Sequence, residues 1–143
     1  MLSSTCKTAI KAVIYLAAAS ETGEKVGIRE VARNIRASEH TVGKILQLLA
    51  RRGLINSNKG PSGGFSISRL QFNRPIIHII EAIEGEQVFR ECGLGLSKCS
   101  AAHPCPIHHE YKMARERVAK LFRENTLKTL CDPVSSGFAY LIG

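Results

Sequence analysis

Residues 28–53 most constrain the fold, because they carry two short helical patterns joined by only a few residues. The first pattern is an amphipathic helix with an apolar face of Ile28, Val31, Ala32 and Ile35. After a tight turn at Arg36 and Ala37, Ser38 can cap a second helix by accepting a backbone N–H, and Gly53 can end it. The inward face of this second helix consists of Val42, Ile45, Leu46 and Leu49. Two helices joined in this way predict a helix-turn-helix.

The exposed positions of the second helix suit contact with nucleic acid. In a helix-turn-helix, the N-terminal residues of the second helix face base edges in the major groove. The candidates here all carry hydrogen-bonding groups: Ser38, His40, Thr41, Lys44 and Gln47. A helix pair of this kind also occurs as a plain packing unit, so the pattern alone leaves both interpretations open.

The stretch that follows predicts a β-hairpin with a glycine-rich tip. Two short strands are expected at Leu54-Ile55 and around Phe65 and Ile67, with the sequence NKGPSGG as the turn. Such a tip can approach a phosphate backbone or a minor groove closely, because glycine has no side chain to clash. The candidate contacts are Lys59, Gly60, Pro61, Ser62, Gly63 and Gly64. An ordinary hairpin is the alternative interpretation.

The distribution of charge favours the nucleic-acid interpretation. The net charge is +8, and residues 1–74 hold twelve Lys and Arg against four Asp and Glu, whereas residues 75–143 hold eight of each. Hydrophobic residues make up 44% of the chain, which is enough for a packed core and too many for a disordered chain. We therefore expect a basic DNA-binding domain over 1–74 and a neutral part with another role over 75–143.

The N-terminus resembles a secretory signal, since Lys7 and Lys11 precede an apolar run. However, its apolar residues follow helical spacing at Ile10, Val13, Ile14 and Ala17, which favours a first helix with one buried face. No stretch is long enough to span a membrane. Five cysteines, an odd number, fit a disulfide framework poorly and a reducing compartment better. We expect a cytoplasmic protein.

The second half predicts a hinge helix, a loop and a longer helix. Pro75 opens a short apolar helix that Gly85 closes, with His78 interpreted as a packed core histidine. Beyond the loop, an apolar seam repeats at the spacing of helices that pack nearly in parallel: Ile107, Tyr111, Ala114, Val118 and Leu121. The charged residues between them, including the run RER at 115–117, are interpreted as solvated. Because the basic half is expected to have its own core, we favour pairing of this seam with a second chain over docking on the same chain.

The loop at about 90–108 concentrates soft metal ligands. Cys92, Cys99 and Cys105 follow the pattern C-x₆-C-x₅-C, and His108 lies three positions further on. Small residues around them cannot form a core, so a metal centre is one source of order. Thiolates suit iron–sulfur clusters, zinc or Cu(I), and the absence of a close C-x₂-C pair leans toward iron–sulfur.

The hairpin sequence KGPSGGF, the three-cysteine loop and the long pairing helix together resemble the IscR/NsrR-type iron–sulfur transcriptional regulators. The resemblance runs from the first helix to the sequence NTLKTLCD near the end. It implies a mainly α fold with a small β-hairpin wing, that is, a winged helix-turn-helix plus a long C-terminal dimerisation helix. It also implies a homodimer on double-stranded DNA with a roughly palindromic operator, and a cluster held by Cys92, Cys99, Cys105 and His108, with 2Fe–2S favoured over 4Fe–4S.

Two features depart from the family pattern. The first cysteine spacing holds six residues where five are common, and Lys7 stands near the position where the nitric-oxide-sensing branch supplies a carboxylate. Cys6 is then an alternative fourth ligand from a second subunit, or else a small buried residue. Cys131 is interpreted as a packing cysteine. His103 and His109 are interpreted as surface residues, with a ligand role in place of His108 as the alternative.

The expected function is therefore a regulator whose operator affinity depends on a cluster that senses nitric oxide, redox state or iron–sulfur status. The alternatives are a regulator of the same fold that uses direct thiol oxidation or zinc, and a small iron–sulfur electron carrier. An enzyme is not expected, because no base-and-orienter set accompanies the cysteines. Neither a membrane nor a small-molecule substrate is expected as a partner.

Overall fold

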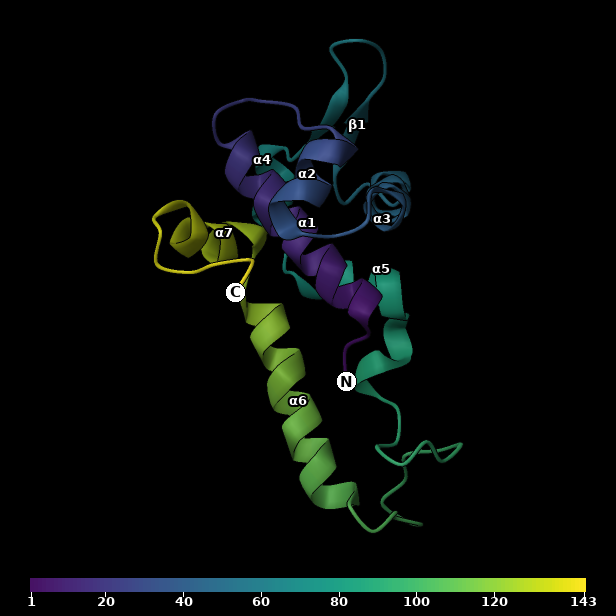
Figure 1. Ribbon diagram of the computed structural model, residues 1–143. Helices are drawn as coiled ribbons and strands as arrows, with labels where there is room; N and C mark the ends of the chain where they lie inside the picture. The colour runs from purple at the N-terminus through teal and green to yellow at the C-terminus, as the bar shows by residue number, and fades with distance from the viewer.

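The computed structural model describes residues 1–143 and is mainly helical, with one two-stranded antiparallel sheet, as the sequence predicts (Figure 1). Its elements are α1 (Ser4–Ser20), α2 (Ile28–Ile35), α3 (Glu39–Arg51), β1 (Asn56–Asn58), β2 (Gly64–Ser66), α4 (Arg69–Phe72), α5 (Ile77–Glu84), the 3₁₀ helix η1 (Glu86–Phe89), α6 (His108–Glu124) and α7 (Leu127–Ser135).

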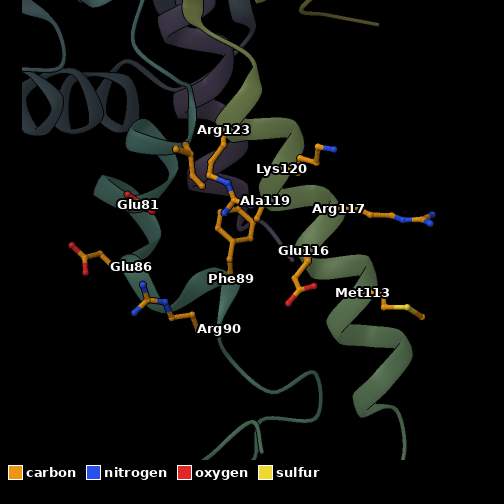
Figure 2. A pocket seen from close by; sticks show the side chains of 11 residues that line it. Glu81, Glu86, Phe89, Arg90, Met113, Glu116, Arg117, Ala119, Lys120 and Arg123 are labelled. Carbon is orange, nitrogen blue, oxygen red and sulfur yellow. The ribbon is translucent and has the colours of Figure 1, made fainter. Parts of the chain in front are cut away.

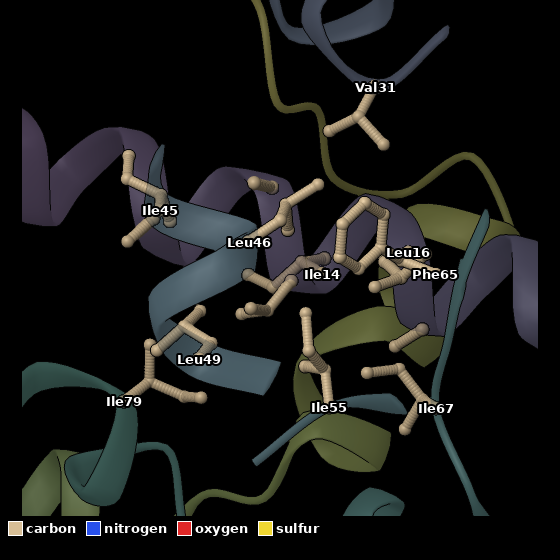
Figure 3. Close-up of a cluster of buried hydrophobic side chains, with 14 of the residues drawn as sticks. Ile14, Leu16, Val31, Ile45, Leu46, Leu49, Ile55, Phe65, Ile67 and Ile79 are labelled. Atoms are coloured by element: carbon tan, nitrogen blue, oxygen red, sulfur yellow. The ribbon is translucent and has the colours of Figure 1, made fainter. Parts of the chain in front are cut away.

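Helix α1 is the centre of the fold. The side chain of Ser3 caps it by accepting a hydrogen bond from the backbone N–H of Cys6 at 3.0 Å. Of the predicted apolar face, Val13, Ile14 and Ala17 are buried and Ile10 is half-buried. Figure 3 shows side chains from α1, α3 and the hairpin region meeting in one apolar cluster. The sequence that imitates a secretory signal is thus a core helix.

The helix-turn-helix forms where the sequence predicts it. Ser38 Oγ accepts a hydrogen bond from the backbone N–H of Thr41 at 3.4 Å, at the start of α3. Arg36 takes a left-handed conformation with φ of 53° in the turn, and Gly53 with φ of 71° follows the end of α3. All four predicted inward residues of α3 are buried.

The hairpin forms, but its first strand begins later than predicted. β1 and β2 pair in the register Asn56 with Ser66, Ser57 with Phe65 and Asn58 with Gly64. Leu54 lies outside the strand because its backbone N–H donates to the Leu49 carbonyl at the end of α3, at 3.0 Å. Ile55 is 1% exposed and belongs to the core rather than to the sheet. Leu54 and Ile55 therefore lie in the connection between α3 and β1 and not in the strand.

The second half helps to complete the core of the first. Ile76 and Ile79 around α5, and Leu127 and Cys131 on α7, belong to the same buried cluster as the apolar residues of α1 and α3. The expectation that the basic half has a complete core of its own is therefore wrong. The interpretation of His78 is wrong as well, because its side chain is 51% exposed, beside Glu81.

Helix α6 runs away from the body of the fold and carries the cysteine loop at its far end (Figure 1). A groove of about 580 Å³ separates much of α6 from α5 and η1, and most residues that line it are charged (Figure 2). Near its C-terminal end α6 packs on the body, with Ala119 buried and the Phe122 ring 6.2 Å from that of Phe89. The described helices include none with the length and apolarity needed to cross a membrane.

Candidate nucleic-acid interface and metal centre

The candidate base-reading residues lie on the free face of α3. Ser38, His40, Lys44 and Gln47 are exposed, and Thr41 is half-buried. They are available because the opposite face of α3 is held by the core. The structure thus brings the predicted residues together on one surface at the start of a helix, where backbone N–H groups and positive charge favour an anionic partner.

The hairpin tip extends beyond the body of the fold (Figure 1). The residues from Lys59 to Ser62 are exposed, and Gly63 and Gly64 are half-buried. The backbone N–H of Gly63 donates to the Gly60 carbonyl at 2.9 Å, which closes the tip. Gly60 has φ of 98° and Gly64 has φ of 148°, so the turn uses conformations that favour glycine. Lys59 therefore lies in a short turn with a defined backbone conformation.

The predicted metal ligands gather at the far end of α6. Cys92, Cys99 and Cys105 lie in the loop between η1 and α6, and His108 is the first residue of α6. Cys99 Sγ lies 3.5 Å from His108 Nδ1. Cys92 and Cys99 also line a cavity of about 760 Å³ that is bounded by residues of the same loop.

Cys92 has an environment that favours its ionised form. The pKa of its thiol is lowered, chiefly because the backbone N–H of Leu94 donates to the sulfur, and then by the backbone of Leu96 and the Cys105 thiol. The distance from the Leu94 nitrogen to Cys92 Sγ is 3.4 Å. Anionic sulfur is the form that binds metals and reacts with electrophiles.

The loop buries two of its three cysteines, leaves Cys99 half-buried and exposes its leucines. Cys92 and Cys105 are each 8% exposed and His108 is 5% exposed, whereas Leu94 is 55% and Leu96 is 52% exposed. Packing of Leu94 and Leu96 therefore does not order the loop, and the side chains that it buries are those of candidate metal ligands.

The predicted ligand set is chemically suited to a soft metal centre. Three thiolates with one imidazole suit an iron–sulfur cluster, and zinc accepts the same ligand types.

Sequence reasoning missed Arg115. The run RER was interpreted as solvated, but Arg115 is only 5% exposed. Its Nη1 and Nη2 lie 3.6 and 3.7 Å from Cys99 Sγ, and Nη1 also donates to the Glu91 carbonyl. The available signal was spacing: Arg115 follows His108 by seven residues, which places both on one face of a helix.

The remaining thiols serve the core. Burial, with Glu84 close by, raises the pKa of the Cys6 thiol to about 12, and Cys6 is fully buried. Cys6 is therefore enclosed by the chain itself, as the interpretation of a small buried residue predicts. Cys131 is fully buried as expected, and burial raises its pKa to about 11. His103 and His109 are exposed.

The predicted seam of α6 remains largely uncovered by the chain itself. Ile107 is 40% exposed, Leu121 is 51% exposed and Ala114 is exposed, while Tyr111 and Val118 are half-buried. The residues that α6 buries are instead His108, Arg115 and Ala119. The exposed seam residues Ile107, Ala114 and Leu121 thus lie beside the face that contacts the rest of the molecule, whereas Tyr111 contacts the cysteine loop.

A winged helix-turn-helix with an exposed reading face defines the class: a DNA-binding transcriptional regulator. The family profile described as "Iron-dependent Transcriptional regulator" matches residues 2–133, and the chain belongs to this family, Rrf2. The chain is accordingly a transcriptional regulator and not an enzyme, as predicted.

Individual relatives agree with this assignment. An HTH-type transcriptional regulator of Aquifex aeolicus is 30% identical over 132 residues, which span 91% of this chain and 90% of that protein. The regulator NsrR of Geobacillus kaustophilus is 33% identical over 95 residues, which span 66% of this chain and 59% of that protein.

Solved structures share the fold. CymR, the global cysteine regulator of B. subtilis, has a TM-score of 0.74 and 18% identity, over 92% of this chain and 96% of that chain. IscR of T. potens has a TM-score of 0.73 and 16% identity, over 97% of this chain and 91% of that chain.

Proposed function

We propose that this regulator binds a roughly palindromic DNA operator as a homodimer, and that an iron–sulfur cluster on Cys92, Cys99, Cys105 and His108 controls its affinity. The observation that carries the cluster is the arrangement of the loop, in which Cys92, Cys105 and His108 are buried and Cys99 is half-buried while the leucines are exposed. We favour 2Fe–2S over 4Fe–4S. The proposal divides the chain into a DNA-binding part over 1–74 and a sensing and pairing part over 75–143.

The DNA contacts follow from the exposed groups. Ser38, His40, Thr41, Lys44 and Gln47 would face base edges, and the wing from Lys59 to Gly64 would contact the backbone or the minor groove. The wing lies at the end of the molecule opposite the cysteine loop, and α3 lies on the body away from that loop, so a bound cluster would not compete with DNA (Figure 1).

The dimer rests on the uncovered face of α6. Ile107, Tyr111, Ala114, Val118 and Leu121 follow a heptad spacing, and three of the five are exposed in the single chain. Pairing of α6 with α6 of a second copy would cover them and place two reading helices on one face of DNA.

Control would pass through α6. When bound, the cluster supplies redox chemistry and reactivity toward nitric oxide. The sulfurs and His108 hold the loop on the first turn of α6, so loss of this anchorage frees the end of the pairing helix. A groove separates much of α6 from the body. A change in the angle between α6 and the body would alter the distance between the α3 helices of the two subunits. A coupling of about 1–3 kcal/mol suffices to change operator occupancy.

Anaerobic purification tests the proposal directly. We expect coloured protein with iron and sulfide in equal amounts, and loss of colour in Cys99→Ala. Operator affinity should differ between loaded and cluster-free protein. It should also fall by orders of magnitude between 50 and roughly 200 mM salt, as for a dimer that neutralises several phosphates. Pale, iron-free wild-type protein whose affinity is independent of its redox history would refute the cluster.

Direct thiol oxidation is the second candidate. Two observations favour it: the Cys105 thiol is close enough to help lower the pKa of Cys92, and a related fold, Staphylococcus aureus CymR, has been solved in an oxidised form. In that case the cluster-free protein would respond to peroxide, and mass spectrometry would find a Cys92–Cys105 disulfide.

A further inference from the structure

Arg115 is a buried cation without a carboxylate partner. It is 5% exposed, and the ion pairs of the chain join other residues: Arg29 with Glu39, Lys120 with Glu124, Lys128 with Asp132, and His78 with Glu81. Burial of an unpaired charge is strongly unfavourable, so such a group requires a negative or strongly polar partner.

The partners of Arg115 are a sulfur and a carbonyl. Nη1 and Nη2 both point to Cys99 Sγ, at 3.6 and 3.7 Å, and Nη1 donates to the backbone carbonyl of Glu91. Its Cζ lies 5.9 Å from the centre of the Tyr111 ring, while Nε is buried with no hydrogen-bond partner. The Cys99 sulfur and the Glu91 carbonyl are therefore the hydrogen-bond acceptors that the buried guanidinium contacts.

We propose that Arg115 is a positioning residue and counter-cation for the cysteine site. Its guanidinium contacts both Cys99 and Glu91 and so holds the loop on α6, and its positive charge offsets the negative charge of a sulfur-ligated group. The second part rests on the proposed function, whereas the first part does not. An N–H donor on a ligand sulfur withdraws electron density from it, so Arg115 raises the reduction potential of a cluster bound there.

The chain offers a matched control. Arg117 lies on the same helix two positions further on, and it is exposed. Arg117→Gln removes the same charge as Arg115→Gln without removing a contact to Cys99. Arg115→Lys keeps the positive charge but removes the planar guanidinium group, which can donate to two acceptors at once.

The first measurement uses the cluster-free full-length protein. Lys98 is exposed and lies beside Cys99, so tryptic cleavage after Lys98 reports how firmly the loop is held. Loss of a charge-assisted hydrogen bond should speed this cleavage on the order of tenfold in Arg115→Gln, with a smaller effect in Arg115→Lys. Arg117→Gln should be cleaved like the wild type. Equal cleavage of Arg115→Gln and Arg117→Gln would overturn the proposal, whatever the colour of the wild type.

The second measurement uses anaerobically loaded protein. The midpoint potential, followed by visible absorption, should be lower in Arg115→Gln than in the wild type and Arg117→Gln, and Arg115→Lys should restore most of the difference. A merely structural role would change the yield of loaded protein and leave the potential of the loaded fraction unchanged, which would overturn the counter-cation part. A wild type without iron would instead refute the proposed function and leave the cleavage test decisive for Arg115. If Arg115→Gln does not fold, Arg115→Lys against Arg117→Lys carries both comparisons.

Discussion

Replacement of Gly63 by alanine should disable the wing without changing any charge. A Cβ at this position would overlap the carbonyl oxygen of Asn58 and lie 2.8 Å from the Gly60 oxygen and 2.9 Å from the Lys59 carbonyl carbon. All three are backbone atoms of the hairpin itself, so no side-chain rotation can relieve the overlap. The tip must open, and the hydrogen bond from Gly63 N–H to the Gly60 carbonyl at 2.9 Å is lost.

The Gly63→Ala substitution should weaken DNA binding more than it lowers the stability of the fold. β1 is fully exposed and the tip lies outside the core, so we expect the free energy of unfolding to fall by only about 1 kcal/mol. If each wing loses one charge-assisted phosphate contact worth about 1.5 kcal/mol, a dimer loses about 3 kcal/mol. That corresponds to a decrease in affinity on the order of 100-fold.

Fluorescence anisotropy with a duplex selected by the wild-type protein from a random pool measures this loss. Gly27→Ala is the matched control, because Gly27 has φ of −82° and no atom within 4 Å of an added Cβ. The slope of affinity against salt should also decrease for Gly63→Ala, by about one per lost phosphate contact. Binding by Gly63→Ala as tight as by Gly27→Ala would show that the closed tip takes no part in recognition.

Further predictions concern the loop, the thiols and the seam. Gly93→Ala would place a Cβ 2.7 Å from the Tyr111 ring, so cluster-free protein should lose protection of the loop from hydrogen exchange while its melting temperature changes little. In cluster-free protein near pH 7.5, iodoacetamide should label Cys92, whose pKa is lowered, before Cys6, whose pKa is raised to about 12; labelling of Cys6 first would contradict the assignment. Since folded Cys6 keeps its proton where the unfolded thiol, with an ordinary pKa of 9.0, has lost it, stability should decrease as pH rises above about 9, and Cys6→Ala should flatten that decrease. Leu121→Glu, at a 51% exposed seam position, should yield monomers in sedimentation experiments with unchanged helix content; an intact dimer would place the interface elsewhere.

Local sequence patterns were sufficient for the helix-turn-helix. A cap at Ser38, an apolar face with helical spacing and a glycine after the last turn act over a few residues, so they predict α3 without knowledge of the rest. The first strand of the hairpin was predicted too early, at Leu54 and Ile55. Ile55 belongs to the hydrophobic core and Leu54 packs against that core, so neither residue is part of the sheet. Pattern alone cannot tell which neighbour an apolar residue will meet.

The sequence indicated the candidate metal ligands but not the residues that surround them. Three cysteines and a histidine in one loop are visible in the sequence, whereas the burial of Arg115 is not, since a charge between other charges on a helix normally faces water. The face of α6 that carries Arg115 becomes buried only because the loop that follows η1 packs against the first turns of α6. His78 shows the converse, since an apolar run did not make it part of the core.

The sequence by itself predicted α1, α2, α3, α5 and α6, the turn between α2 and α3, the glycine-rich tip and a set of candidate soft ligands, because spacing and side-chain chemistry act locally. Tertiary structure decided that α5 and α7 help to complete the core of the basic half, that Cys6 is enclosed, and that an arginine lies against Cys99. Those outcomes depend on which surfaces meet when distant segments pack, and burial is a property of the assembled chain rather than of any residue in it.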